Sequence, residues 1–403
     1  MKIEMIVIGG GVAGMIAAIT AKRNNKKVMI LEKKTQLGLK LGLTGKGRCN
    51  LTNYSEVEEH IDNIPVNGQF MRNSLYRFSP FALLDFLKTM GIETKIERGN
   101  RVFPSSENAQ EVRKKLMDEI ERLKIPVKKE KVIAVGKEKD FYLKTNLKNT
   151  YTAQSVLIAT GGKSYPSTGS TGDGFAFAKK FGHKIINPRQ ALVPLICEKK
   201  ANKLNRLKLK NVKLTLLENN SQKYEDLGEL EFIKNKITGP LSLSASIFIA
   251  DNPQKYKIKL DLKPGLNRKE LDARLIRDFH KFASKNFSNS LNNLLPKKMI
   301  PFIIEESGIN PTKNAASITK KERQKLGYIL KNLEFKIKSL AAWDEAIITS
   351  GGVSVNEINP NTMESRKIKN LYFAGEIIDV AAFTGGYNLQ IAFSSGFVAG
   401  LNC

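Results

Sequence analysis

Cysteine and histidine are scarce in this chain, which has three of each among 403 residues. Cys49, Cys197 and Cys403 lie far apart and form no Cys-X-X-Cys pair, which argues against a disulfide framework and against a thiol–disulfide mechanism. This usage is typical of a reducing compartment, so we expect a cytoplasmic protein. We also expect no metal site.

Long apolar runs are missing as well. Glycine or a charged residue interrupts every run well before the roughly 20 residues that cross a bilayer, so we expect no membrane association. The first apolar strand begins directly at the amino terminus, so we expect no signal peptide. A chain of this length predicts two or three domains.

The three histidines offer little for proton chemistry. His183 follows Phe181-Gly182 at the end of a predicted helix, where we expect a capping or dipole role. His60 and His280 lie in polar helical contexts, and we expect both at the surface. Proton transfer must therefore be sought among other side chains.

Acidic residues are few relative to basic ones, with 39 against 66, and the formal net charge is +27. Such an excess invites a nucleic-acid interpretation. However, the lysines occur as pairs spread through the chain, and no long basic tail stands out. We interpret them as a lysine-rich solvated surface and expect no dedicated nucleic-acid site.

The strongest motif lies at the amino terminus. The apolar run Met5–Ile8 leads into Gly9-Gly10-Gly11-Val12-Ala13-Gly14, and a second strand, Lys27–Leu31, delivers Glu32. In a G-x-G-x-x-G turn the first glycine permits the tight turn, the second admits a pyrophosphate, and the third allows close helix–strand packing. The helix amino end favours phosphate, and the acid binds a ribose. The motif predicts a dinucleotide site.

Two further strands end at glycine. Ser155–Ala159 runs into Thr160-Gly161-Gly162, and Leu371–Phe373 runs into Gly375, followed by Glu376 and Asp379. Ligands of a parallel sheet lie beyond the carboxyl ends of its strands, so three such ends can line one extended ligand. A carboxylate in this setting can bind polyol hydroxyls, and the helix expected after Gly385–Gln390 can face a phosphate or a ring carbonyl.

The remaining patterns predict an α/β protein, with a Rossmann-type nucleotide domain built from both chain ends and an insertion between them. We place the nucleotide domain at 1–187 and 345–403, a β-rich substrate or cap subdomain at 188–265 and 331–344, and a helical subdomain at 266–330. The elements expected are helices over 81–90, 108–124, 175–181 and 388–401, a hairpin of 132–135 with 141–145, and antiparallel strands over 192–196, 207–217, 224–232 and 256–262.

Motifs across nearly the whole chain resemble the HI0933-like (YhiN- and BaiN-like) family of FAD-dependent oxidoreductases, which are flavoproteins of the two-dinucleotide-binding type. They are the Gly9–Glu32 unit, Thr44-Gly45-Lys46-Gly47-Arg48-Cys49-Asn50-Leu51-Thr52-Asn53, Arg101-Val102-Phe103-Pro104, Ala159–Pro166, Gly239-Pro240, Thr349–Val353, Phe373–Asp379 and Gly385–Gln390. Lys46 departs from the pattern, because relatives often carry asparagine or a small residue there.

The resemblance implies non-covalent FAD. It implies cofactor contacts at Gly9, Gly11, Val12, Ala13, Gly14, Glu32, Lys33, Lys40, Gly45, Arg48, Cys49, Asn50, Val132, Thr160, Gly161, Gly162, Gly375, Glu376, Asp379, Asn388, Leu389 and Gln390. Glu32 would hold the adenosine ribose and Asp379 the ribityl chain. Arg48 would balance phosphate charge or stabilise the anionic reduced flavin, the alternative being a surface ion pair.

The candidate catalytic residues are Tyr387, Tyr165, Arg48 and Cys49. Both tyrosines lie in Gly-rich loops and can donate a proton or a hydrogen bond to a substrate carbonyl, and we prefer Tyr387. Either can equally be a packing residue. Cys49 can approach the flavin ring, although a small buried apolar role is the favoured alternative.

The expected reaction is hydride transfer between flavin N5 and a small or steroid-like substrate, most simply NAD(P)H-linked reduction of a C=C bond. Gly169–Gly174 has glycines but no strand before it, so NAD(P)H would use a shared or transient site. Three alternatives stay open. They are an oxygen-dependent oxidase of a small amino-ketone, a nucleic-acid-associated (RNA-modifying) flavoprotein suggested by the charge, and a flavin-binding protein without turnover.

Overall fold

The computed structural model describes residues 3–403 and divides into two compact units. The discontinuous unit comprises Met1–Ala191 together with Ala342–Cys403, and the inserted unit is Leu192–Ala341. Within residues 3–403, no helix combines the length and apolar character that crossing a membrane requires. The same residues contain no group of three His, Cys, Asp or Glu side chains arranged to hold a metal ion.

The discontinuous unit is built on a seven-stranded sheet of order β6-β2-β1-β9-β8-β7, with β18 paired to β9. The pairs β6–β2, β2–β1, β1–β9 and β9–β18 are parallel, whereas β7–β8 and β8–β9 are antiparallel. The bounds are β1 Ile3–Ile8, β2 Val28–Leu31, β6 Val127–Lys128, β7 Val132–Lys137, β8 Phe141–Thr145, β9 Thr150–Ile158 and β18 Leu371–Phe373. This arrangement confirms the Rossmann-type sheet and the predicted hairpin.

The register of the parallel strands aligns their carboxyl ends. Ile8 of β1 lies beside Leu31 of β2 and Ile158 of β9, and Ile158 lies beside Phe373 of β18. The residues that follow these four strand ends therefore emerge at one edge of the sheet. This confirms the expectation that strand ends far apart in the sequence meet.

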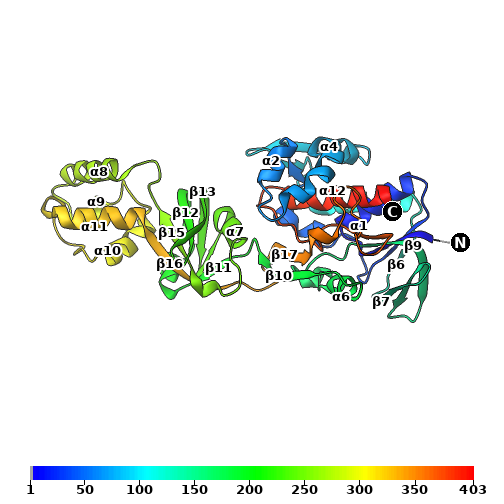
Figure 1. Ribbon diagram of the computed structural model, residues 1–403. Helices are drawn as coiled ribbons and strands as arrows, with labels where there is room; N and C mark the ends of the chain where they lie inside the picture. The colour runs from blue at the N-terminus through cyan, green and yellow to red at the C-terminus, as the bar shows by residue number, and fades with distance from the viewer. Residues whose placement is uncertain (1–2) are drawn as a thin grey trace. The chain divides into compact units, whose positions relative to one another are not determined.

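Helices α1 (Val12–Arg23) and α12 (Tyr387–Asn402) lie side by side (Figure 1). A Cβ added at Gly396 would lie 2.4 Å from the Ala13 carbonyl oxygen, and one at Gly400 would lie 2.4 Å from that of Ala17. Both contacts advance together, so the helices run parallel at a distance that only glycine permits. The two amino ends consequently point to the same side of the unit.

Shorter elements complete this unit. They are α2 (Val57–Asp62), α3 (Arg72–Arg77), α4 (Pro80–Lys88), α5 (Ala109–Arg122), α6 (Asp173–Lys180), a small sheet of β3 (Thr52–Asn53), β4 (Thr94–Glu97) and β5 (Arg101–Pro104), and the antiparallel pair β10 (Ile185–Ala191) and β17 (Ile348–Val353). Asn108 caps α5 and Ser79 caps α4 through their side chains, near the predicted helix starts.

The inserted unit contains a closed antiparallel barrel of order β11-β14-β13-β12-β15-β16. Its strands are β11 Leu195–Cys197, β12 Lys208–Glu218, β13 Ser221–Ile233, β14 Lys236–Thr238, β15 Tyr256–Asp261 and β16 Leu333–Leu340. Along β15 the buried residues Tyr256, Ile258 and Leu260 alternate with lysines and Asp261, as expected when one face of a strand fills a barrel.

Helices join the barrel in the inserted unit, namely α7 (Pro240–Ser246), α8 (Arg268–Lys281), α9 (Phe287–Ser290), α10 (Ile300–Ser307) and α11 (Lys320–Lys331). Leu275 of α8 and Leu326 of α11 belong to the same hydrophobic cluster as barrel residues such as Phe335. The boundaries between the two units lie within a few residues of the boundaries of the nucleotide domain predicted from the sequence. The finer division into a β-rich and a helical subdomain stays a prediction.

Candidate functional site

The loop between β1 and α1 has the geometry of a phosphate-binding turn. Gly9 has φ +104°, and a Cβ there would lie 2.5 Å from the Ala159 carbonyl oxygen. A Cβ at Gly14 would lie 2.0 Å from the Gly9 carbonyl oxygen, whereas nothing lies within 4 Å of one at Gly11. Helix α1 begins after Gly11 without a side-chain cap. An open amino end on a tightly packed turn is suited to a pyrophosphate.

Glu32 is fixed at the end of β2 beside this loop. Its Oε2 accepts the Gly10 N–H at 2.7 Å, and its Oε1 accepts the Lys34 N–H at 2.8 Å. Each carboxylate oxygen keeps a further lone pair for a ribose hydroxyl. Lys33 forms an ion pair with Asp173 at the start of α6, at 2.6 Å, and Val132 lies buried at the start of β7.

The loop from Leu41 to Cys49 is conformationally strained. Gly45, Lys46, Gly47 and Cys49 all have positive φ, and for Lys46 and Cys49 this left-handed conformation is unfavourable. Asn50 follows, and its side-chain Oδ1 is buried with no hydrogen-bond partner among residues 3–403. A buried acceptor without a donor costs free energy, so Asn50 fits a residue that accepts a hydrogen bond from a ligand.

Two of the candidate catalytic residues in this loop are already engaged. Arg48 forms ion pairs with Glu97 and with Glu107, the latter at 3.0 Å, and its guanidinium lies 4.2 Å from the Phe103 ring centroid. These contacts correspond to the surface ion pair of the alternative interpretation, and contact with a cofactor stays a prediction. Cys49 is fully buried, which raises its thiol pKa to about 12. The thiol is therefore protonated at neutral pH and packs as a small apolar group.

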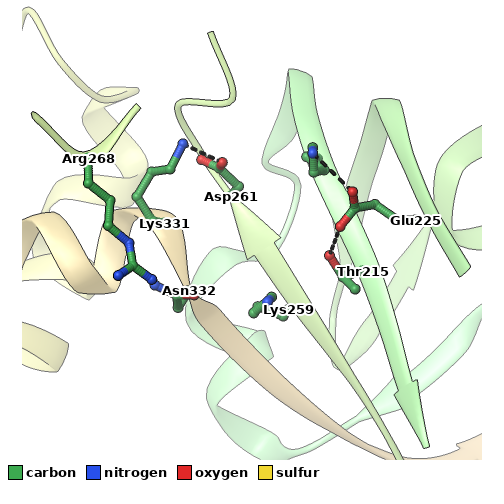
Figure 2. A pocket seen from close by; sticks show the side chains of 8 residues that line it. Thr215, Glu225, Lys259, Asp261, Arg268, Lys331 and Asn332 are labelled. Carbon is green, nitrogen blue, oxygen red and sulfur yellow. Dashed lines mark hydrogen bonds and ion pairs between the residues drawn. The ribbon is translucent and has the colours of Figure 1, made fainter. Parts of the chain in front are cut away.

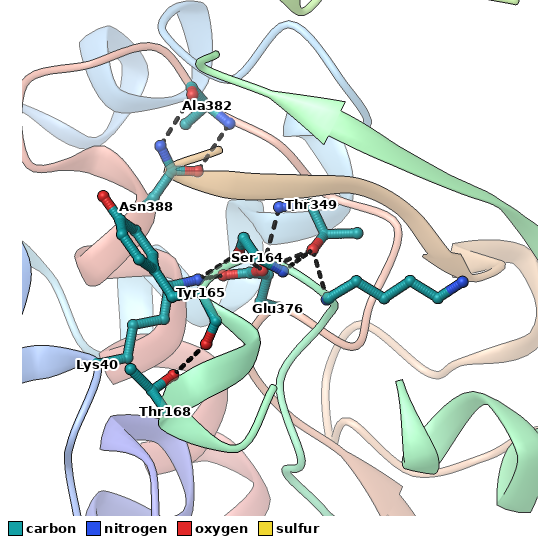
Figure 3. Close-up of polar contacts among 9 residues, drawn as sticks. Lys40, Ser164, Tyr165, Thr168, Thr349, Glu376, Ala382 and Asn388 are labelled. Atoms are coloured by element: carbon teal, nitrogen blue, oxygen red, sulfur yellow. Dashed lines mark hydrogen bonds and ion pairs between the residues drawn. The ribbon is translucent and has the colours of Figure 1, made fainter. Parts of the chain in front are cut away.

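Glu376, just beyond β18, is the centre of a polar network (Figure 3). Its Oε1 accepts the Ser164 hydroxyl at 2.6 Å and both the hydroxyl and the N–H of Thr349, at 2.8 and 3.0 Å. Its Oε2 pairs with Lys40, which also donates to the Ser164 hydroxyl at 2.6 Å. The network joins four segments far apart in the sequence and holds a carboxylate at the edge where the strand ends meet.

Asp379 is a second carboxylate beyond β18 and, unlike the partly exposed Glu376, it is buried, with only 8% exposed. The Asn67 side chain donates to its Oδ2 at 3.1 Å. Burial raises the pKa of this carboxylate. Three features oppose the rise: the hydrogen bond from Asn67, the hydrogen bond from the Gly351 N–H and the positive charge of Arg189. A desolvated carboxylate with free acceptor capacity is suited to hold the hydroxyls of a ribityl chain.

Sequence reasoning missed Arg189 and Ser350, which lie opposite each other on β10 and β17. The Arg189 Nε and the Ser350 Oγ are both buried and have no hydrogen-bond partner among residues 3–403. Directly opposed residues of an antiparallel pair share a face, so a donor and a hydroxyl are available side by side. No motif signalled Arg189, because its strand was not predicted.

The two tyrosines differ in accessibility. Tyr387 is 9% exposed and its ring packs edge-on against His60, with centroids 4.9 Å apart. The expectation that His60 lies at the surface is wrong, since His60 is fully buried, and its Nε2 contacts the Asn53 carbonyl at 3.0 Å. Tyr165 is half-buried at φ +49°, with the Lys40 Nζ 5.9 Å from its ring centroid.

Asn388 and Gln390, two residues expected to contact the cofactor, form side-chain hydrogen bonds with other residues of the protein. The Asn388 amide donates to the carbonyls of Ala382 and Phe383, and its Oδ1 accepts the Ala382 N–H, closing the loop before α12 (Figure 3). The Gln390 side chain accepts from Thr52 at 2.7 Å and donates to the Phe78 carbonyl at 2.9 Å. These contacts position the start of α12, so any cofactor contact would come from its backbone.

The remaining predicted contacts surround the same edge. Thr160 is the second residue after β9, and its hydroxyl is buried without a partner among residues 3–403. Gly161 has φ +71°, and Gly375 has φ +76° with room only for a hydrogen beside Ala13. Gly162 leaves room for Thr349, and Leu389 is partly buried against the core. The unpartnered side-chain oxygens of Asn50 and Thr160 and the open amino end of α1 fit a ligand with phosphate and hydrogen-bonding groups, such as FAD.

Comparison with known proteins agrees with this geometry. Residues 3–402 match the HI0933-like protein Rossmann domain. The chain is 31% identical to the 3-dehydro-bile acid delta(4,6)-reductase of Clostridium scindens, over 98% of this chain and 97% of that protein. It is 27% identical to the ribosomal RNA dihydrouridine synthase of Escherichia coli, over 98% of this chain and 96% of that protein.

A solved structure shares the fold. An open conformation of a flavocytochrome c3 fumarate reductase superposes with a TM-score of 0.53 at 15% identity, covering 100% of this chain and 78% of that one. At this identity the likeness concerns the fold alone. It agrees with the Rossmann-type sheet of the discontinuous unit.

Proposed function

We propose, from the premise that the chain belongs to the HI0933-like family and is an FAD-dependent oxidoreductase, that it reduces a C=C bond conjugated with a carbonyl group at the expense of NAD(P)H. The observation that carries the proposal is a shared chemistry in two relatives. A delta(4,6)-reductase of a 3-dehydro steroid and a dihydrouridine synthase both, by name, saturate a C=C bond beside a carbonyl.

The residues at the strand ends fit the binding part of this task. Glu32 would hold the adenosine ribose, the α1 amino end the pyrophosphate, and Asp379 the ribityl chain. Bound FAD supplies the hydride chemistry. The Arg189 Nε and the Ser350 hydroxyl, both unpartnered within residues 3–403, would donate to a carbonyl or an anionic ring edge.

We assign the proton of the reduction to Tyr165. A tyrosine is protonated at neutral pH, and burial raises the pKa of the Tyr165 hydroxyl further, so this group is available as a donor and gives up its proton only to the strongly basic carbanion or enolate that hydride addition leaves on the substrate. Its hydroxyl forms no hydrogen bond within residues 3–403, and the residue stands beside the Lys40–Glu376 network. Tyr387 has a raised pKa too, but its ring is enclosed against His60.

Replacing Tyr165 with phenylalanine is expected to lower kcat for enone reduction about 100-fold, because general-acid catalysis typically contributes that much or more. The flavin spectrum and its bleaching by NADPH should be unchanged, since the proton is needed only when substrate is reduced. Stopped-flow reoxidation of the reduced enzyme by an enone steroid measures the step directly. Tyr387→Phe is the matched control, and a loss confined to Tyr387→Phe would return the role to that residue.

A second candidate substrate is uracil within RNA, with the same bond chemistry. The excess of positive charge and the second relative favour it. Turnover without oxygen separates the two substrates. Reoxidation of the NADPH-reduced enzyme by an enone supports the first candidate, and reoxidation by RNA supports the second. Reoxidation by oxygen alone, after reduction by an amino-ketone, would support the oxidase alternative instead.

A further inference from the structure

A charged pocket of about 200 Å³ lies on the outer face of the barrel (Figure 2). Strands β12, β13 and β15 meet there with the first residue of α8 and the last residue of α11. It is lined by Lys213, Thr215, Glu225, Lys259, Asp261, Arg268, Lys331 and Asn332. All of these residues belong to the inserted unit, whereas the strand ends described above belong to the discontinuous unit.

Two of the four cations in the pocket are neutralised. Lys213 pairs with Glu225 at 3.0 Å, and Lys331 pairs with Asp261. The Lys331 ammonium is also held by two backbone carbonyls, at 2.7 and 3.0 Å, so it is a structural group. Within residues 3–403, neither Lys259 nor Arg268 forms an ion pair with a carboxylate, which leaves the pocket with two surplus positive charges.

The strands around the pocket concentrate further positive charge. Lys257 and Lys259 point outward from β15, and Lys257 lies directly opposite Lys336 of β16. Glu334 neutralises Lys257 at 3.0 Å. Glu334 also lies directly opposite Lys259. Together these side chains carry three positive charges and one negative charge, so this face keeps an excess of positive charge that a negatively charged ligand can balance and a neutral substrate cannot.

The inserted unit as a whole is the more basic part of the chain. Leu192–Ala341 carries 30 basic and 15 acidic residues, a net charge of +15, against +12 for the longer discontinuous unit. The expectation of an evenly spread lysine surface therefore needs refinement, because more than half of the net charge lies in the smaller unit. Such a concentration is the electrostatic footprint of a polyanion-binding surface.

We propose that this pocket binds a backbone phosphate of RNA, with Lys259 and Arg268 as the direct contacts. Arginine presents a planar fork that matches phosphate oxygens, and lysine adds a point charge. Arg268 is the first residue of α8, where the Asn267–Glu270 capping box fixes the backbone that carries it. The biological meaning of the site rests on the RNA-directed form of the proposed function, but binding itself requires no turnover.

The test compares two double variants of the full-length protein. Lys259→Ala with Arg268→Ala is expected to weaken binding of a fluorescently labelled single-stranded RNA about 10-fold or more. The slope of log K against log salt should fall by about 0.7 for each RNA phosphate that the variant no longer neutralises. Lys320→Ala with Lys321→Ala removes equal charge at the start of α11, about 16 Å along the helix from Lys331, and should change little.

Competition identifies the source of the phosphate. RNA that competes at far lower phosphate concentration than inorganic phosphate or NADPH supports the proposal. If NADPH displaces the labelled RNA as effectively as unlabelled RNA does, the site binds a nucleotide phosphate and the proposal is overturned. If both double variants weaken RNA binding equally, binding depends on the overall charge of the unit, and the proposal of a specific site is overturned. The visible flavin spectrum of each variant is recorded in parallel, so a failure of cofactor binding is recognised separately.

Discussion

Replacing Gly11 with aspartate is expected to abolish FAD binding while the protein stays folded. A Cβ at Gly11 meets nothing within 4 Å, and its φ of −72° suits any residue, so the side chain fits. Aspartate is a preferred helix N-cap, and α1 has no side-chain cap, so apo-protein stability should change by less than about 1 kcal/mol. The carboxylate would, however, face the pyrophosphate.

The expected loss follows from Coulomb's law. Two unit charges about 4 Å apart at an effective dielectric constant of about 20 repel by about 4 kcal/mol, which corresponds to roughly a thousandfold weaker binding. Gly11→Asn is the matched control, because it has nearly the same size and capping ability without the charge. Titration of the apo-proteins with FAD, followed by flavin fluorescence, measures both. Equal, tight binding by wild type and Gly11→Asp would place the pyrophosphate elsewhere.

Gly396→Ala is expected to destabilise the discontinuous unit by about 2 kcal/mol, because overpacking a close contact typically costs about 1–3 kcal/mol. The added methyl would lie 2.4 Å from the Ala13 carbonyl oxygen, and backbone must move to admit it. A shift of α12 also displaces the loop that Asn388 closes, so FAD affinity should fall together with stability. Thermal unfolding of the apo-protein should occur about 4–8 °C lower.

Gly327→Ala, within α11, is the matched control for this substitution. The nearest atom to a Cβ there is a Leu275 methyl group at 3.8 Å, so the change only replaces a poor helix former with a good one. It should stabilise the inserted unit by about 0.5–1 kcal/mol. Differential scanning calorimetry of both variants measures the opposite signs. A stabilising Gly396→Ala would contradict the close packing of α1 on α12.

The strand ends were predictable from the sequence because their signals are local. A buried apolar run followed by glycine marks a strand end, and the parallel register that aligns Ile8, Ile158 and Phe373 follows from the Rossmann topology. The helices predicted over 81–90 and 108–124 likewise begin close to the residues whose side chains cap α4 and α5, Ser79 and Asn108. These features depend on neighbours within a few positions.

The long-range contacts could not be read in the same way. Ser164 and Thr349 join Glu376 across 212 and 27 residues, and no spacing rule connects them. Arg189 lies on a strand whose irregular register and proline at position 188 hide its pattern. His60 has polar neighbours in the sequence, yet it is buried, because the face of α2 that carries His60 packs against Tyr387 at the start of α12. Such placements depend on tertiary packing.

The measurement that tests the flavoprotein assignment most directly is the visible absorbance spectrum of the purified protein, repeated without oxygen after NADPH is added. We expect the two-band spectrum of a flavin, released on denaturation as FAD at one per chain, and bleached by NADPH. A flavin spectrum that NADPH does not bleach would contradict the NAD(P)H-linked reductase. A protein that shows no flavin band, even after incubation with excess FAD, would contradict the FAD site at the strand ends and every step built on it.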